Sequence, residues 1–120
     1  MARILIVDDD PAQIEIRTLL LENEGHQVRS AQTVEEATRS FGEAPADIAL
    51  MDLRLPRSED GLALIRWLRE ASSALRIVVL SGWAADLGSQ PELALVDRLL
   101  AKPVRTGQLL GLIRDLSPCT

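Results

Sequence analysis

The sequence predicts an α/β fold: a five-stranded parallel sheet of strand order 2-1-3-4-5, doubly wound as five strand–helix units with helices on both faces. Short β-rich runs alternate with segments of helical character along the chain, which is the pattern of a parallel sheet with helical crossovers. Most of these runs are apolar throughout, as in strands covered on both faces. A length of 120 residues with 47% hydrophobic residues suits a single domain over residues 1–120.

The first strand–helix unit has clear boundaries. Residues 3–7 are an apolar run that predicts a buried strand. Asp10 is the predicted N-cap of the first helix, with Pro11 in the first helical position and Gln13 closing a capping box. Gly25 is the predicted stop. The apolar face of this helix is predicted to comprise Ile14, Ile16, Leu19, Leu20 and Leu21.

The second unit begins with a weak strand and continues with a well-marked helix. Residues 27–29 predict a short strand. Thr33 and Glu36 have the spacing of a capping box. They predict a helix that runs to about Gly42.

The third and fourth strands are strongly apolar, and a loop and a helix separate them. Residues 47–51 predict a strand that ends at Asp52, and residues 53–60, which include a proline and several charges, predict a loop. Residues 61–71 predict a helix, and residues 76–80 give the clearest strand pattern in the chain. The apolar face of the helix is predicted to comprise Leu62, Ile65 and Leu68.

The segment after the fourth strand is the least regular part of the chain. Gly88 and Pro91 interrupt residues 83–96, so any helix there is expected to be short or broken. Residues 98–101 predict a fifth strand, and residues 106–116 predict the final helix.

Composition and charge exclude several classes of function. The net charge of −5 argues against direct nucleic-acid binding. No apolar run approaches the ~18–20 residues of a membrane-spanning helix, and the N-terminus does not read as a signal peptide. Cys119 is the one cysteine, so no internal disulfide is expected and a reducing, cytoplasmic location is predicted.

Five polar side chains follow the predicted strands at their carboxyl ends. In open parallel sheets ligands bind at those ends, where the strand order reverses. Converging carboxylates repel each other unless one of them is protonated or a cation lies among them, and oxygen ligands favour a hard ion such as Mg²⁺. A lysine and a hydroxyl beside that ion suit a phosphoryl group, and a carboxylate is able to act as its nucleophile. The five are Asp8, Asp9, Asp52, Ser81 and Lys102.

Each of these residues also has an ordinary explanation. The three aspartates from 8 to 10 are equally typical of a solvated acidic turn, and Asp52 of a loop. Ser81 is typical of a turn, and Lys102 of a surface cation before a helix. Their joint placement at four strand ends favours the functional interpretation.

Four motifs in this order and at this spacing resemble those of the receiver domains of two-component response regulators. The resemblance covers essentially the whole chain. The motifs are LIVDDD at 5–10, MDLRLP at 51–56 followed by Asp60 and Gly61, VVLSG at 78–82, and AKP at 101–103.

The resemblance implies roles for the acidic residues. Asp52 matches the phosphoacceptor, and Asp8 and Asp9 match the acidic pair that holds Mg²⁺, with Asp9 the favoured direct ligand. Arg54 is expected to offer its backbone carbonyl to the metal. In this family a sensor histidine kinase or a histidine phosphotransfer protein donates the phosphoryl group from a phosphohistidine, and phosphorylation shifts a conformational equilibrium.

The resemblance also implies a switch. Ser81, followed by Gly82, matches the hydroxyl that turns toward the phosphoryl group. Lys102 matches the lysine that pairs with it, and Pro103 the proline that follows by a cis bond. Leu99 stands where the family often has an aromatic switch residue.

Other positions depart from the family pattern or bear on its chemistry. The resemblance places Arg54 and Trp83 at positions that control water access, and both are bulky, which predicts slow self-dephosphorylation. For Trp83, packing over the loop after the fourth strand is the alternative. The loop over 56–60 is one residue longer than the common pattern. The interrupted segment lies where the fourth helix of the family forms part of the output face, so partner recognition is expected to be unusual.

The leading prediction is therefore a phosphorylation-controlled switch that turns over no separate substrate, with an unidentified downstream effector. Oligomeric state stays open, with a homodimer as one candidate. The main alternative is a phosphate-independent interaction module whose switch has degraded. A Mg²⁺-dependent phosphatase is disfavoured because Arg54 stands where such an enzyme usually has an acid. A flavin-binding protein is disfavoured because three aspartates would repel the flavin phosphate.

Overall fold

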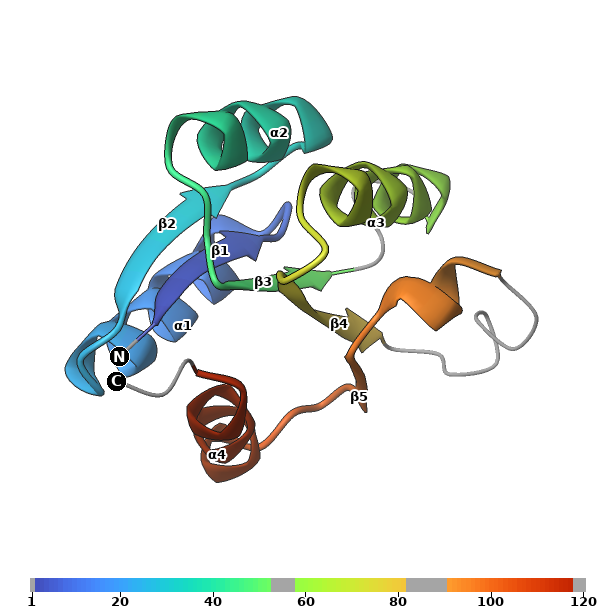
Figure 1. Cartoon of the computed structure of the whole chain (residues 1–120). Coiled ribbons are helices and arrows are strands. Elements are labelled where there is room, and N and C mark those ends of the chain that lie inside the picture. Colours follow the sequence, from blue (N-terminus) through green and yellow to red (C-terminus); the bar gives the residue numbers. More distant parts are fainter. Residues whose placement is uncertain (1, 53–57, 82–90, 118–120) are drawn as a thin grey trace.

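Five parallel strands form one sheet in the order β2-β1-β3-β4-β5 (Figure 1). This computed structural model describes residues 2–52, 58–81 and 91–117. The predicted fold class and strand order are confirmed. The strands are β1 (Arg3–Val7), β2 (Gln27–Ala31), β3 (Ile48–Asp52), β4 (Arg76–Ser81) and β5 (Arg98–Ala101). The helices are α1 (Pro11–Asn23), α2 (Val34–Glu43), α3 (Ser58–Ala71), the 3₁₀ helix η2 (Pro91–Leu95) and α4 (Thr106–Leu116).

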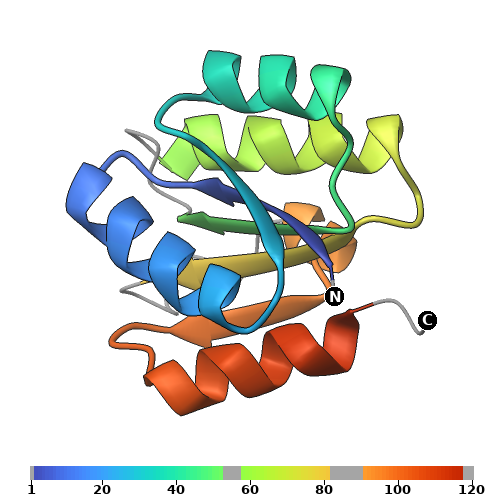
Figure 2. The ribbon, with the colours of Figure 1, turned by 90° about the vertical axis from the view of Figure 1, so that its left-hand side faces the viewer.

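The sheet is covered on both faces, by α2 and α3 on one and by α1 and α4 on the other (Figure 2). Successive strand residues point to opposite faces, so each strand contributes to two cores. In β1, Leu5 and Val7 pack on the side of α2 and α3, whereas Ile4 and Ile6 pack on the side of α1 and α4. This double burial is the reason that the strands are apolar throughout.

Helix α1 begins and ends where the sequence predicts. The Asp10 carboxylate accepts the backbone N–H of Ala12 at 2.9 Å and caps the helix. Gly25, with a φ of +92°, has the left-handed conformation that ends helices.

The predicted apolar face of α1 is wrong at two positions. Ile14 and Leu21 are buried, but Ile16 is 53% exposed and Leu19 is 62% exposed. Each residue turns an α-helix by about 100°, so Ile16 lies about 200° around the axis from Ile14. The buried stripe of α1 is therefore narrower than its apolar composition indicates.

Helix α2 has the predicted cap. The Thr33 hydroxyl accepts the N–H of Glu36 at 3.1 Å. The Glu36 carboxylate reaches back to the N–H of Gln32 at 3.0 Å, one residue before the position that a capping box uses. The helix ends at Glu43, close to the predicted boundary.

Two boundaries near the third and fourth strands differ from the prediction. Helix α3 begins at Ser58, inside the segment predicted as a loop up to Asp60. An acidic residue in the first turn of a helix interacts favourably with the exposed N–H groups there, so Asp60 belongs in the helix. Strand β4 extends one residue further than predicted, to Ser81. The predicted longer loop over 56–60 is partly outside the described residues.

The irregular segment before the fifth strand contains a short helix, as predicted. Residues Pro91–Leu95 form the 3₁₀ helix η2, and Gly88 lies outside the described residues. Within 2–52, 58–81 and 91–117 the chain has four α-helices, one fewer than the five strand–helix units predicted. Proline is well suited to the first position of η2, because the N–H that it lacks would have no partner within the helix.

One arginine joins three elements at the amino ends of the strands, opposite the edge where the polar motif residues lie. The Arg69 guanidinium, on α3, donates to the carbonyl of Leu75 at 2.7 Å and to that of Leu95 at 2.8 Å. It also donates to the Asp97 carboxylate at 3.0 Å. Asp97 in turn accepts the N–H of Ile77 at 2.7 Å. This Arg69–Asp97 clamp holds the end of α3 against the starts of β4 and β5.

Candidate functional site

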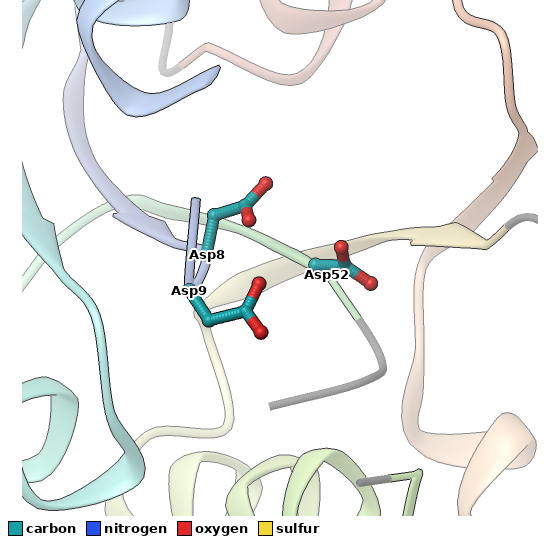
Figure 3. Close-up of side chains that lie close together, drawn as sticks. All are labelled: Asp8, Asp9 and Asp52. Carbon is teal, nitrogen blue, oxygen red and sulfur yellow. The ribbon is translucent and has the colours of Figure 1, made fainter. Parts of the chain in front are cut away.

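Three carboxylates lie together at the carboxyl ends of β1 and β3 (Figure 3). Asp8 and Asp9 follow β1, and Asp52 is the last residue of β3. The pairing of Val7 with Met51 brings these two strand ends side by side. One oxygen of each carboxylate lies within 4.8 Å of an oxygen of the other two. The structure therefore gathers the three predicted acidic residues.

Strand alternation explains why these side chains and a lysine share one face. Ile6, Leu50 and Leu100 all pack toward α1 and α4. Two residues later on each strand come Asp8, Asp52 and Lys102, so the same period of two directs all three toward the α1 and α4 side. The site therefore lies at the end of the buried apolar layer between the sheet and helices α1 and α4, where polar residues follow the apolar ones along each strand.

The electrostatics of the cluster favour a cation. Partial burial, followed by the negative charges of Asp8 and Asp52, raises the pKa of the Asp9 carboxyl above its ordinary value. After burial, the like charges of Asp8 and Asp52 contribute to this shift, as expected where carboxylates are brought together. An all-oxygen set of two or three carboxylates is a typical arrangement for Mg²⁺, which keeps several waters.

Lys102 lies against the acidic cluster, as predicted. Its Nζ donates to Oδ2 of Asp52 at 2.6 Å. Its backbone N–H donates to the carbonyl of Ser81 at 2.8 Å, which continues the pairing of β4 with β5 past Ala101. The Lys102–Pro103 peptide bond is cis, as the family resemblance implies.

Ser81 is buried at the end of β4. Leu80 is the register partner of Asp52, so Ser81 stands one residue beyond it on the neighbouring strand. Ser81 therefore lies at the same edge of the sheet as the carboxylates, two residues after Val79, which packs toward α2 and α3.

The remaining predicted positions lie elsewhere or are not described. Arg54, Gly82 and Trp83 lie outside the described residues. Leu99 is 39% exposed on β5 and pairs with Val79. Because Leu100 packs toward α1 and α4, the alternation turns Leu99 to the opposite face of the sheet.

Arg17 belongs to the site and was not predicted as a site residue. Its Nη1 donates to Oδ2 of Asp8 at 2.8 Å. Arg17 lies on the buried stripe of α1, three residues after Ile14 and four before Leu21. The sequence signal that could have identified Arg17 is an arginine on the buried side of a helix, two turns after an acidic loop.

A cavity of about 600 Å³ opens beside the carboxylates, between α1 and the start of α4. Its polar wall contains the three carboxylates with Arg17 and Lys102. Its apolar wall includes Ile16, Leu20 and Leu109. The cavity gives a ligand of moderate size access to the acidic cluster.

The fold and this edge of the sheet define a class of protein. A doubly wound parallel sheet that gathers acidic ligands, a lysine and a hydroxyl at the ends of its strands is suited to hold a phosphoryl group beside a hard cation. The family model described as the response regulator receiver domain matches residues 4–114. The chain belongs to this family, whose members are signalling domains of two-component systems, and its acidic cluster fits the phosphorylation site.

Similar proteins agree with this assignment. The virulence transcriptional regulatory protein PhoP of Salmonella typhimurium is 40% identical over 86 residues, which are 69% of this chain and 38% of PhoP. A CheY-like response regulator receiver domain from Methylobacillus flagellatus is 29% identical, with a TM-score of 0.86 over 98% of this chain and 99% of that one. The response regulator TrrA of Thermotoga maritima, solved in complex with Mg²⁺-BeF, is 26% identical, with a TM-score of 0.85 over 97% of this chain and 99% of that one.

The matched region thus covers well under half of the length of PhoP. Among the described residues, no helix is long and apolar enough to cross a membrane.

Proposed function

We propose that this receiver domain is a phosphorylation-controlled switch that accepts a phosphoryl group on Asp52 with the help of Mg²⁺. One observation carries the proposal: the Asp52 carboxylate lies 2.6 Å from the Lys102 ammonium and within 4.8 Å of the Asp8 and Asp9 carboxylates. This arrangement therefore brings together a carboxylate nucleophile, an ammonium group that can neutralise the phosphoryl charge, and a set of metal ligands.

The proposed reaction is a transfer from a phosphohistidine. One oxygen of Asp52 attacks the phosphorus, a P–O bond forms, and the P–N bond to the donor imidazole breaks. The leaving nitrogen keeps the electron pair and is protonated by solvent. Lys102 stabilises the negative charge on the phosphoryl oxygens, and the Ser81 hydroxyl hydrogen-bonds one of them once the group is in place.

The chain's own residues suit the metal. Asp9 and Asp52 are the proposed direct carboxylate ligands, Asp8 supports them, and the backbone carbonyl of Arg54 completes the set. When bound, Mg²⁺ supplies charge neutralisation between carboxylates and phosphoryl oxygens. The raised pKa of Asp9 supports this assignment, because a cation beside Asp9 would offset the charges of Asp8 and Asp52 that contribute to the shift. The Mg²⁺-BeF complex of TrrA also supports it.

Phosphorylation is proposed to change the surface around β4 and β5. Ser81, with Gly82 after it, moves toward the phosphoryl group, and Pro103 fixes the chain after Lys102. Leu99 transmits the movement only as an aliphatic side chain, and the short helix η2 lies just before β5 in the chain. The downstream effector is therefore expected to recognise an unusual surface around β4 and β5. The same surface is a candidate interface for a homodimer.

The proposed partners follow from the family. The donor is a sensor histidine kinase or a histidine phosphotransfer protein, and the output is an effector protein rather than nucleic acid bound by residues 1–120. PhoP is a transcriptional regulator, and such an output would need residues beyond the matched region. We place residues 1–120 in the cytoplasm as one receiver unit.

The decisive experiment is intact-protein mass after incubation with MgCl₂ and acetyl phosphate. The expected result is a single phosphoryl adduct that EDTA and D52N abolish. D115N is a matched control, because it changes an exposed aspartate on α4 and keeps the adduct. If Mg²⁺ binds and neither acetyl phosphate nor a phosphohistidine protein gives the adduct, the phosphate-independent interaction module replaces this proposal.

A further inference from the structure

Arg17 is the feature of the site that the proposed reaction does not use. It comes from α1, not from the strand ends that supply the other polar residues, and its guanidinium lies 2.8 Å from Oδ2 of Asp8. The side chain of Arg17 is only 12% exposed and that of Asp8 only 2%. An ion pair as buried as this one is screened little by solvent, so both charges act at short range on whatever enters the cavity.

Both oxygens of Asp8 are engaged within the protein. Oδ1 accepts the N–H of Asp10 at 2.9 Å, and Oδ2 accepts the guanidinium of Arg17. Asp9, in contrast, is exposed at the mouth of the cluster. Arg17 therefore neutralises the charge of Asp8, one of the three carboxylates, before any ligand binds.

The formal charges show the size of the effect. The three carboxylates carry −3, and Lys102 and Arg17 together carry +2, so these five groups sum to −1. Without Arg17 the sum is −2. The net negative charge of these groups attracts a divalent cation that enters the cluster. The Arg17 guanidinium, which is one of these groups, repels the cation at close range.

We propose that Arg17 is a built-in counter-ion that holds Asp8 in place in the metal-free protein and weakens divalent-cation binding at the site. This inference rests on the proposed Mg²⁺ site and names the residue that sets its affinity. Arg17 is a positioning residue, since it acts on the metal through Asp8 and through its own charge. Mg²⁺ then binds only when its concentration is high enough to compete with a cation that the fold already supplies.

The test is the affinity of the metal-free protein for MgCl₂, and separately for MnCl₂, measured by titration calorimetry. Two charge-removing variants, R17Q and R17M, are compared with the wild type, because glutamine keeps a donor for Asp8 and methionine keeps only the apolar stem. R17K keeps the charge. R114Q is the matched control: it also removes one arginine charge, from an exposed pair with Glu24 at 3.7 Å.

The expected result is a Kd for Mg²⁺ lower by about tenfold in R17Q and R17M, because a unit charge a few ångströms from a divalent ion has an effect of this order. R17K and R114Q are expected to stay within about twofold of the wild type. Raising the salt concentration should narrow the gap between R17Q and wild type only slightly, since the pair is buried.

A second readout separates charge from packing. In EDTA, R17Q is expected to unfold at a lower temperature than wild type, since Asp8 loses the positive charge of its partner. Saturating MgCl₂ should raise the unfolding temperature of R17Q by more than it raises that of wild type. A folded R17Q or R17M with the wild-type Kd, or a weaker one, would overturn the inference. Absence of Mg²⁺ and Mn²⁺ binding in wild type and variants alike would instead overturn the proposed metal site itself.

Discussion

At the scale of single residues, the Asp9 carboxyl is subject to electrostatic repulsion, because three carboxyl groups lie together at one edge of the sheet. Partial burial and the charges of Asp8 and Asp52 raise its pKa in the folded protein. A raised carboxyl pKa gives stability that is present at low pH and is lost as the pH rises through the folded pKa. Above the folded pKa the metal-free protein therefore carries the repulsion between Asp9 and its two neighbours.

The substitution D9N is expected to raise the unfolding free energy of the metal-free protein at pH 7. The gain should be about 1 kcal/mol or less, because solvent screens so exposed a group, and it should shrink as the pH is lowered toward 4. Urea unfolding in EDTA at pH 7 and pH 4.5 measures both effects. D10N is the control, since it removes the same charge and asparagine caps helices as well as aspartate. Equal behaviour of D9N and D10N would contradict the electrostatic explanation.

Arg54 and Trp83 follow Asp52 and Ser81 by two positions each, and the resemblance assigns them to water access. Replacing both with alanine is expected to shorten the lifetime of the Asp52 phosphoryl group several-fold, because smaller side chains leave more room for an attacking water. The decay of the phosphorylated mass after removal of acetyl phosphate gives the half-life. R39A, on the exposed side of α2, should leave it unchanged. An unaltered half-life in the double variant would show that these two side chains do not control the access of water to the phosphoryl group.

At the scale of elements, the Arg69–Asp97 clamp joins α3 to the starts of β4 and β5. Burial acts to raise the pKa of Asp97, but the N–H of Ile77 and the guanidinium of Arg69 outweigh it and lower the pKa. A lowered carboxyl pKa gives stability that is present above the unfolded value of about 3.8 and is lost as the pH falls through the folded pKa. The clamp is therefore intact at neutral pH.

D97N is expected to lower the unfolding free energy at pH 7 by about 1–3 kcal/mol, the range for hydrogen bonds to a charged group. The difference from wild type should narrow as the pH falls below about 3.8, since the unfolded wild-type chain then takes up a proton at Asp97 that the folded protein takes up only at lower pH. Urea unfolding at pH 7 and at pH 3.5 measures both values, with D115N as the control for a lost surface charge. A difference that stays constant with pH would show that the charge of Asp97 contributes nothing.

The elements also show what local sequence determines. The caps at Asp10 and Thr33 were predictable, because a cap depends on a few neighbouring residues. The buried stripe of α1 was not, since composition alone does not fix which side of the helix faces the sheet. Ile16 and Leu19 are apolar and exposed for that reason. The start of α3 was placed too late because a charged segment reads as a loop.

At the scale of the whole molecule, the site is a consequence of the sheet. Four strands end together, and the period of two that buries Ile6 and Leu50 also aims Asp8 and Asp52 at the same side. Their convergence was predictable once the strand order was. Arg17 was not predicted, because its pairing with Asp8 depends on how α1 packs against the sheet. The positions from 53 to 57 and from 82 to 90 remain predictions.

The site lies between elements from both ends of the chain, so binding of Mg²⁺ is expected to stabilise the whole fold. One bound ion raises the unfolding free energy by RT ln(1 + [Mg²⁺]/Kd), which is about 2.7 kcal/mol at a hundred times the Kd. Urea unfolding at increasing MgCl₂, with ionic strength held constant by NaCl, measures this dependence, and above the Kd its slope against ln[Mg²⁺] should equal RT for one site. A stability that follows ionic strength alone would mean that the carboxylates bind no ion. A slope near 2RT would place a second ion in the cavity beside α1 and α4.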